Sequence, residues 1–326
     1  MSQFPIVMPL YDRSEYLAQS INTIADWTIS KKIYFFQDNI RDSSCAFSRS
    51  KIDRVQMNAI NLSKERGIPF EFMRRGEHLG IRKNITRSIS ESFENSLHLF
   101  CVEDDVVVSP SFPDFCLKHL ESEEHLIINA NRFTSRQDWA EVLVASNYTA
   151  KDYSSWYSNI FRTWGWFCSR NIWQDYLPDS KLLMTKEIVQ KICHLPPIYI
   201  NSMKRAAKLC NTYELDSWAV PFQYYLWNTG KKILSPFVNM SSHIGIHGRH
   251  FSTSKDIILG SLHYQNQPYY RGPISSKMVD ISSNEVSKSR EVDEHSYIFG
   301  GNKYDKLKKT YYRDAQNLFM EFLPIY

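Results

Sequence analysis

The sequence predicts an α/β fold with a mixed, mainly parallel sheet flanked by helices. Over the first 130 residues, short apolar runs alternate with amphipathic stretches, which is the pattern of successive βαβ units. Hydrophobic residues make up 43% of the 326-residue chain, which is enough for a sizeable core. We therefore expect one large α/β domain with an elaborated second half.

The elements of the first half are predicted one by one from periodicity. Short apolar runs between turn residues predict strands at 4–10, 32–36, 69–73, 97–102 and 126–129. Apolar residues recur every three or four positions, as Leu17, Ile21 and Ile24 do, in predicted helices at 14–27, 50–66, 80–95 and from about 111. Strands joined through helices in this way run parallel.

The second half is less regular. Residues 131–165 are polar and aromatic and are expected to form loops that cover or complete a site. Beyond them, the sequence predicts helices at 170–177, 181–193, 200–210 and 216–228, a strand at 232–238 and a turn region at 239–254.

The end of the chain differs in composition from the rest. Residues 265–300 hold few apolar positions, which indicates a long excursion, and an amphipathic helix is predicted at 304–322. We therefore expect a main domain at 1–254, divided near residue 130, and a C-terminal helical extension at 255–326.

Charge and cysteine content exclude several classes of protein. A net charge of only +4 implies no extended nucleic-acid surface. The N-terminus lacks a basic segment, and no stretch reaches the ~18 uncharged apolar residues of a membrane span. The six cysteines are scattered without metal-type spacing, which favours a reducing compartment, so we expect a cytoplasmic protein. Aromatic residues reach 14%, as expected for stacking on bases and sugars or for an aromatic-rich core.

The most informative stretch is an acidic triplet. Glu103, Asp104 and Asp105 directly follow the predicted buried strand at 97–102. Three adjacent carboxylates repel one another, and a divalent cation relieves this repulsion by taking their oxygens as ligands. At the carboxyl edge of a parallel sheet they would lie where open α/β folds bind ligands. The alternative is an acidic turn that caps the next helix.

The stretch 101–112 resembles the metal-binding Asp-x-Asp region of GT-A glycosyltransferases, including family 2 enzymes. It is most similar to the Glu-Asp-Asp variant of N-acetylglucosaminyltransferases that act early on complex N-glycans, and to related bacterial polysaccharide enzymes. The resemblance implies a GT-A fold over about residues 4–254 and a nucleoside diphosphate sugar as donor substrate. It also implies that Asp105 binds Mn²⁺ or Mg²⁺, while Asp104, together with Glu103, approaches the ribose or sugar.

Upstream segments resemble the donor-binding parts of the same family. Asp12 and Arg13 stand in the nucleotide loop after the first strand, and Asp38 stands at the end of the second, where an acid reads the base. Arg82 and Lys83 lie in the first turn of the third helix, near the expected phosphate. The family's usual Asn is His78 here. Taken alone, the two acids could be strand-end caps and the two basic residues a solvated face.

The second half resembles the acceptor side of these enzymes. Trp164, Gly165 and Trp166 form a Trp-Gly-Trp segment whose indoles would pack against sugars, or would belong to an aromatic core. Another segment, Glu214-Leu-Asp216-Ser-Trp218, is similar to the acid-plus-Trp signature of inverting enzymes. We expect Asp216 to be the general base, with Glu214 as second choice, although Asp216 could equally be a helix N-cap.

A histidine-rich stretch resembles the end of the catalytic domain in this family. The resemblance places His250 near the diphosphate or metal, and His243 stands where the family often has Asn. Arg249 could offset the charge of the leaving group. Three histidines within eight residues would also suit a zinc site, but no Cys or acid nearby completes one.

The sequence thus predicts a metal-dependent, inverting glycosyltransferase that acts on a saccharide or lipid-linked glycan acceptor. Residues 1–130 would bind the nucleotide sugar and residues 131–254 the acceptor. The basic helix near the C-terminus could contact a membrane surface peripherally or dock on the domain. Two other functions stay open: a nucleotidyltransferase that makes the activated sugar, and a non-catalytic saccharide-binding module.

Overall fold

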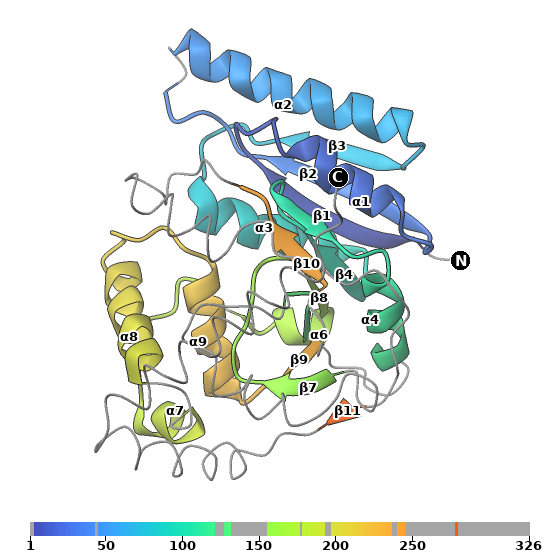
Figure 1. Cartoon of the computed structure of the whole chain (residues 1–326). Coiled ribbons are helices and arrows are strands. Elements are labelled where there is room, and N and C mark those ends of the chain that lie inside the picture. Colours follow the sequence, from blue (N-terminus) through green and yellow to red (C-terminus); the bar gives the residue numbers. More distant parts are fainter. Residues whose placement is uncertain are drawn as a thin grey trace, which may run out of the picture.

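The computed structural model confirms the α/β prediction. It describes residues 3–42, 45–120, 127–131, 155–176, 178–192, 197–236, 240–245 and 278–279. A sheet with helices on both faces occupies the centre of the molecule, as Figure 1 shows. The predicted C-terminal extension at 255–326 lies outside the described residues, apart from one short strand.

The first half forms the predicted elements in the predicted order, with one strand in addition. They are β1 (Phe4–Leu10), α1 (Leu17–Ala25), β2 (Lys31–Gln37), α2 (Ala46–Glu65), β3 (Phe70–Arg74), α3 (Gly80–Glu94), β4 (His98–Cys101), β5 (Val106–Val108), α4 (Phe112–Leu120) and β6 (Ile127–Asn129). The apolar run after the acidic triplet is thus a strand of its own, because three consecutive valines favour extended backbone.

The second half corrects two expectations. Its elements are β7 (Ser155–Ser158), β8 (Trp166–Ser169), α6 (Arg170–Trp173), α7 (Lys186–Lys191), α8 (Pro197–Asn211), α9 (Ala219–Thr229), β9 (Ile233–Pro236), β10 (Ser241–His243) and β11 (Met278–Val279). Part of the expected loop at 131–165 is strand β7, and part of the expected turn at 239–254 is strand β10. Both are too short to show periodicity, and both form by pairing with strands far away in the sequence.

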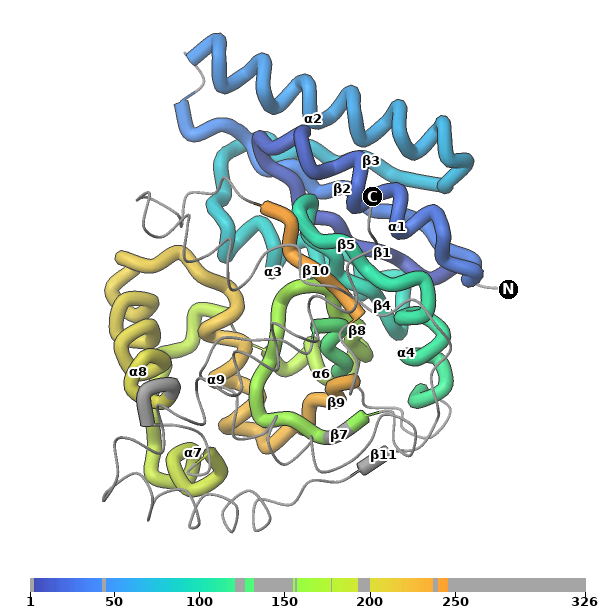
Figure 2. The backbone as a smooth tube through the Cα atoms, viewed as in Figure 1, coloured from blue at the N-terminus to red at the C-terminus, as the bar shows by residue number. Residues whose placement is uncertain are grey.

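The strand order creates a switch point between β1 and β4. The nine strands of the main sheet follow the order β11-β7-β9-β6-β8-β4-β1-β2-β3, and β10 pairs with β5 in a separate two-stranded sheet (Figure 2). Strands β1 to β4 all run parallel, so their carboxyl ends share one edge. The chain moves outward from β1 through β2 to β3 and then returns to place β4 on the other side of β1.

This reversal explains how the helices are distributed. Right-handed crossovers place α1 and α2 on one face of the sheet and the returning α3 on the other. Successive side chains of β1 point to opposite faces: Ile6 and Met8 pack with α1 and α2, whereas Val7 packs with α3 and α9. A third apolar cluster joins α7, α8 and α9.

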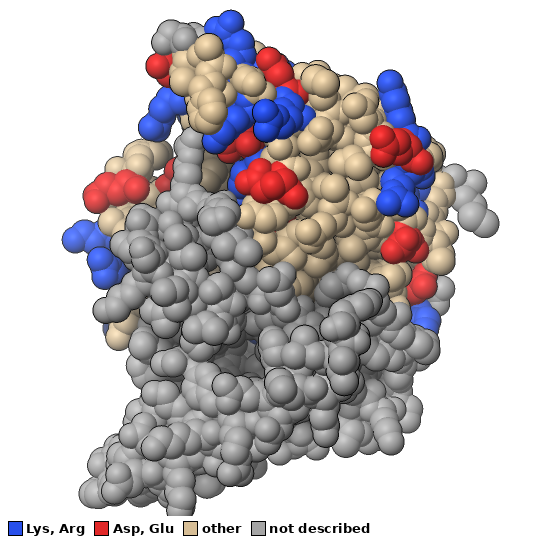
Figure 3. Space-filling model, turned by 45° about the horizontal axis from the view of Figure 1, so that its top comes forward, with Lys and Arg blue, Asp and Glu red and all other residues tan. Residues whose placement is uncertain are grey.

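Three sequence expectations about the surroundings of the protein can be compared with the described residues. None of their helices is long and apolar enough to cross a membrane. On the surface that Figure 3 colours, basic and acidic side chains lie side by side rather than in one large patch of a single sign. The cysteines that the structure describes are all free thiols.

Candidate functional site

The candidate site lies at the switch point of the sheet. The loop that follows β1 carries Asp12 and Arg13, and the turn that follows β4 carries Glu103, Asp104 and Asp105. The two strands are adjacent, and Val102 N, directly after β4, donates to Val7 O of β1 at 3.0 Å. Ligands of open α/β sheets bind in the crevice at such a point.

Arg13 links two carboxylates of the triplet. Its Nη2 donates to Asp104 Oδ1 at 2.6 Å, and its Nη1 donates to Asp105 Oδ2. The side chains of Asp104 and Asp105 are only 4% and 2% exposed, against 28% for Arg13. A single guanidinium thus reaches from the solvent side onto two buried acids.

Asp105 is also held by residues from β10 and the turn after it. His243 Nε2 donates to Asp105 Oδ2 at 3.1 Å, and Ile244 N donates to the Asp105 carbonyl at 2.8 Å. Gly245 approaches so closely that a Cβ on it would overlap Asp105 Oδ2. Asp105 Oδ1 is buried and accepts no hydrogen bond from the described residues.

His243 is positioned in turn by Trp164. The two rings stack with centroids 5.0 Å apart and planes 18° apart, and Ser241 Oγ donates to the Trp164 carbonyl at 2.5 Å. Gly165, the next residue, has a φ of +77°, and a Cβ on it would lie 3.1 Å from Val108 Cγ2. Glycine therefore permits the turn that brings Trp164 to the site.

The electrostatics of the triplet favour bound protons or cations. Burial raises the pKa of Glu103 to about 8, and the charge of Asp105 adds to this. Burial also raises the pKa of Asp104 to about 7, against the effect of Arg13. Burial would raise the pKa of Asp105 too, but His243 and Arg13 outweigh it and lower that pKa. Burial opposes the charge of Arg13, and the three acids hold its pKa above the usual value.

These donors suit a hard divalent cation in part. Asp104 and Asp105 supply carboxylate oxygens, and the buried Asp105 Oδ1 lacks a partner in the described part of the chain. Within that part, however, no three His, Cys, Asp or Glu side chains gather closely enough to hold an ion by themselves. The other expected ligand, His250, lies outside the described residues together with Arg249.

Asp38 lies at the carboxyl end of β2, as expected, but its carboxylate contacts the start of α3. Oδ1 accepts from Leu79 N at 2.8 Å and from Asn39 N, and Oδ2 accepts from Gly80 N at 3.0 Å. His78 Nδ1 is 2.9 Å from Oδ2, and the His78 ring packs against Tyr11. The strand-end cap, left open above, accounts for these contacts.

Asp216 contacts the same helix from the other side. Its oxygens accept from Ile81 N at 2.7 Å and Arg82 N at 3.1 Å, so the carboxylate caps α3 rather than α9. Arg82 is buried and donates to the carbonyls of Ser217 and Cys210, instead of facing the triplet. Lys83 is exposed, and so is Glu214, which accepts from Thr212 Oγ1.

The aromatic candidates fall into two groups. Trp166 and Trp218 are 0% and 3% exposed and stack with each other at 5.6 Å inside the core cluster that includes Phe222. Neither indole has an exposed face on which a sugar could pack. Trp164, just before β8, is only partly buried. Of the expected acceptor residues, Trp164 is linked to the acidic triplet, because it stacks on His243, which contacts Asp105.

Sequence reasoning did not identify the contact of His243 with Asp105, or the packing of Gly245 and Trp164 around it. His243 was noted only as a departure from the family pattern. The residues at 241–245 carry no strand pattern of their own, and the pairing of this segment with β5 needs tertiary structure.

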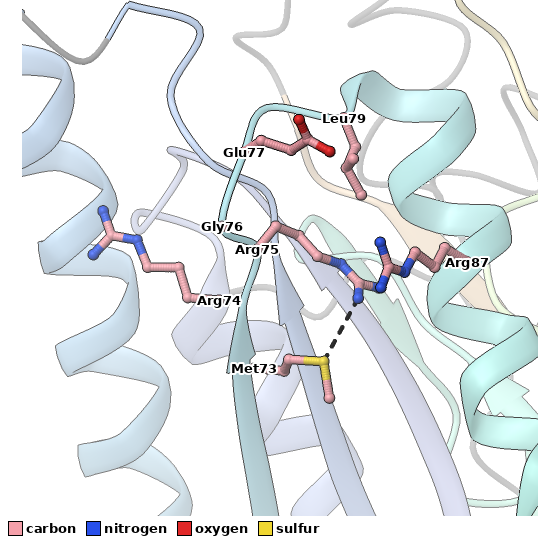
Figure 4. Close-up of a pocket in the computed structure, with 7 residues that line it drawn as sticks. All are labelled: Met73, Arg74, Arg75, Gly76, Glu77, Leu79 and Arg87. Carbon is pink, nitrogen blue, oxygen red and sulfur yellow. Dashed lines mark hydrogen bonds between the residues drawn. The ribbon is translucent and has the colours of Figure 1, made fainter.

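A cavity of about 330 Å³ lies elsewhere, between the end of β3 and α3 (Figure 4). It is lined by Met73, Arg74, Arg75, Gly76, Glu77, Leu79 and Arg87. Its arginines are paired: Arg74 with Asp53, and both Arg75 and Arg87 with Glu91. Glu77 in the wall adds a third carboxylate to Asp53 and Glu91, so the three arginines carry no excess positive charge to attract an anion.

No protein family profile matches the chain, and no curated protein matches it. Solved structures are similar at a low level. TarS 1-349 of S. aureus with UDP-GlcNAc gives a TM-score of 0.38 and 8% identity over 53% of this chain, which spans 47% of that structure. TarS 1-349 with UDP gives a TM-score of 0.38 and 10% identity, and the match covers 82% of this chain and 67% of that structure. Apo UDP-glucose pyrophosphorylase gives a TM-score of 0.39 and 8% identity, and the match covers 72% of this chain and 90% of that structure. Likeness at this level identifies no family.

Proposed function

We propose that this chain is a glycosyltransferase that takes a sugar from a nucleoside diphosphate sugar. One observation carries the proposal: an acidic triplet, two of whose carboxylates are buried and paired with a cationic side chain, stands at the switch point of a parallel sheet. Burying charged groups costs free energy. Buried charged groups with shifted pKa values are therefore often found where they bind a ligand or take part in a reaction. Open α/β sheets bind nucleotides at this position.

The chemistry of such a transfer explains the charges. When the sugar leaves, negative charge grows on the diphosphate, and a positive group beside it lowers the barrier. Asp104 and Asp105 would hold a Mn²⁺ or Mg²⁺ ion, with phosphate oxygens and water completing its ligands. Such an ion supplies Lewis-acid stabilisation of the leaving group. Arg13, whose partly exposed side chain already lies at the triplet, would contact the diphosphate directly.

The remaining residues are assigned by their place at the same edge. Asp12 lies close enough to Asp104 to raise the pKa of that carboxyl. Asp12 and Asp38 would contact the nucleoside. Trp164 would offer its indole to the acceptor. The acceptor is a saccharide or lipid-linked glycan, as in the synthesis of surface polysaccharides.

Asp216 is our candidate general base. Its residue is exposed, so an acceptor hydroxyl can approach the carboxylate although both oxygens accept from α3. An inverting reaction needs one such base on the acceptor side. Glu214, exposed on the same segment, is the second candidate.

A nucleotidyltransferase is the second candidate function. The observation that favours it is the placement of Arg13, because a basic residue after the first strand also suits binding of a triphosphate. The two functions release different products. A transferase releases a nucleoside diphosphate from a nucleotide sugar, whereas a nucleotidyltransferase releases pyrophosphate from a nucleoside triphosphate and a sugar phosphate.

The test is an assay of product release. The protein would be incubated with Mn²⁺ and a panel of nucleotide sugars, with simple saccharides as acceptors, and released nucleoside diphosphate would be measured. A matched incubation would supply nucleoside triphosphate and sugar 1-phosphates and measure pyrophosphate. We expect nucleoside diphosphate release that Asp105→Asn abolishes. Pyrophosphate release alone would overturn the proposal in favour of the second candidate.

A further inference from the structure

Arg13 occupies the place where a cation would bind the triplet. Its Nη1 and Nη2 bind Asp105 Oδ2 and Asp104 Oδ1, so an ion that used these two oxygens would have to replace the guanidinium. We propose that Arg13 and a divalent cation compete for these carboxylates. Arg13 holds the triplet in the free protein, and it turns to the diphosphate when donor and cation bind. Only this last step rests on the proposed function.

The burial pattern shows how the exchange can occur. Asp104 and Asp105 are almost completely buried, whereas more than a quarter of the Arg13 side chain is exposed. Arg13 lies in the irregular loop after β1 and not in a helix or strand. Its side chain can therefore swing toward solvent by changing its torsions, while the carboxylates stay in place.

The charges show why Arg13 alone is not sufficient. It brings one positive charge to three carboxylates, and when all three are ionised the excess negative charge would repel a diphosphate. The buried Asp105 Oδ1, unpaired among the described residues, is a further acceptor that the guanidinium leaves unsatisfied. A divalent cation would balance this charge and could take the Asp105 Oδ1 atom as a ligand.

The diphosphate gives the displaced arginine a new partner. A guanidinium has five N–H donors in a planar fork that suits phosphate oxygens. Arg13 can then replace its ion pairs with the two carboxylates by an ion pair with the phosphate. Nucleotide and cation would consequently strengthen each other's binding. The diphosphate draws Arg13 away from the carboxylates that the cation uses, and the cation neutralises the negative charge that repels the diphosphate.

The first experiment measures Mn²⁺ binding without nucleotide, by electron paramagnetic resonance titration of the full chain. We expect Arg13→Ala to bind Mn²⁺ about tenfold tighter than the unchanged protein, because two carboxylates lose their competitor. Arg74→Ala, which removes the same charge from an exposed pair with Asp53, is the control and should bind as the unchanged protein does. Equal or weaker Mn²⁺ binding by Arg13→Ala would overturn the inference.

A second variant guards against misfolding. Arg13→Lys keeps a positive charge but presents one nitrogen instead of a fork. Its Mn²⁺ affinity should therefore lie between those of the unchanged protein and Arg13→Ala. Mn²⁺ should also raise the melting temperature of Arg13→Ala more than that of the unchanged protein. A smaller rise in Arg13→Ala would contradict the competition.

Repeating the titration with UDP separates this inference from the proposed function. We expect UDP to increase the Mn²⁺ affinity of the unchanged protein by a larger factor than that of Arg13→Ala. An equal factor would overturn the role of Arg13 in the exchange. Failure of UDP to bind any form of the protein would count against the proposed function, and the metal-only comparison would still decide the competition.

Discussion

Asp105 illustrates, at the scale of single residues, how a carboxylate becomes tolerable inside a protein. Its side chain is 2% exposed, yet one oxygen receives both Arg13 and His243. Trp164 stacks on His243 and fixes its ring, so Trp164 influences Asp105 through His243. Removing a partner of a buried charge costs more than removing a surface ion pair, because the charge is left uncompensated.

Gly245 gives a direct test of this packing. Gly245→Ala should destabilise the protein by about 1–3 kcal/mol, because the new methyl group would overlap Asp105 Oδ2 and displace it. Gly76→Ala is the control, since nothing lies within 4 Å of a Cβ at that position. Urea unfolding would compare the two variants. Identical midpoints would show that Gly245 does not pack against Asp105.

At the scale of elements, the N-terminus of α3 holds the carboxylates of two predicted site residues. Its first four backbone N–H groups cannot bond within the helix, and carboxylates from two distant segments satisfy several of them. Asp38 comes from the end of β2 and Asp216 from the segment before α9. The N-terminus of α3 therefore joins the two halves of the chain beside the switch point, where negative charge is favoured by the helix dipole.

Asp38→Ala should lower the free energy of unfolding by about 1–2 kcal/mol, because the N–H groups of Leu79 and Gly80 lose their acceptor in a buried position. The matched control is Asp53→Ala. It breaks an exposed ion pair with Arg74 and should cost no more than about 1 kcal/mol. Thermal unfolding of both variants provides the comparison, and a larger loss in the control would refute the capping role.

Asp216→Asn separates capping from catalysis. Asn is as good an N-cap as Asp, so the melting temperature should change little. An amide cannot accept the acceptor proton, so kcat should fall by about 100-fold or more if Asp216 is the base. Transfer rates and melting temperature would be measured on the same preparation. A variant that keeps full activity would move the base to Glu214 or elsewhere.

At the scale of the whole molecule, the fold rests on a sheet that is packed on both faces. On the α3 side, Trp166, Trp218 and Phe222 form one continuous aromatic cluster that carries α9. Phe222→Ala should therefore destabilise the protein by about 3–5 kcal/mol through the cavity it creates. Phe47→Ala on α2, where the side chain is 71% exposed, should change stability by less than about 0.5 kcal/mol. Equal effects in denaturant titrations would contradict this view of the core.

The sequence predicted the fold better than it predicted the site. Apart from β5, the strands and helices from β1 to α4 were predictable because each has a local signal, either a short apolar run or a helical periodicity such as Leu17, Ile21 and Ile24 in α1. Strands β7 and β10 were not, because pairing with distant strands creates them. The Trp-Gly-Trp motif could not show that Trp166 begins a strand and enters the core while Trp164 stays outside. Nor could it show which helix Asp216 would cap.

The most direct test of the central claim is a calorimetric titration of nucleoside diphosphates, first with Mn²⁺ and then with EDTA. Asp105→Asn would be titrated beside the unchanged protein, and Asp53→Asn would serve as a control for an exposed acid. We predict that one nucleoside diphosphate binds in the presence of Mn²⁺ and that only Asp105→Asn loses this binding. Absence of nucleotide binding, or binding that ignores Asp105→Asn, would contradict a donor site at the acidic triplet.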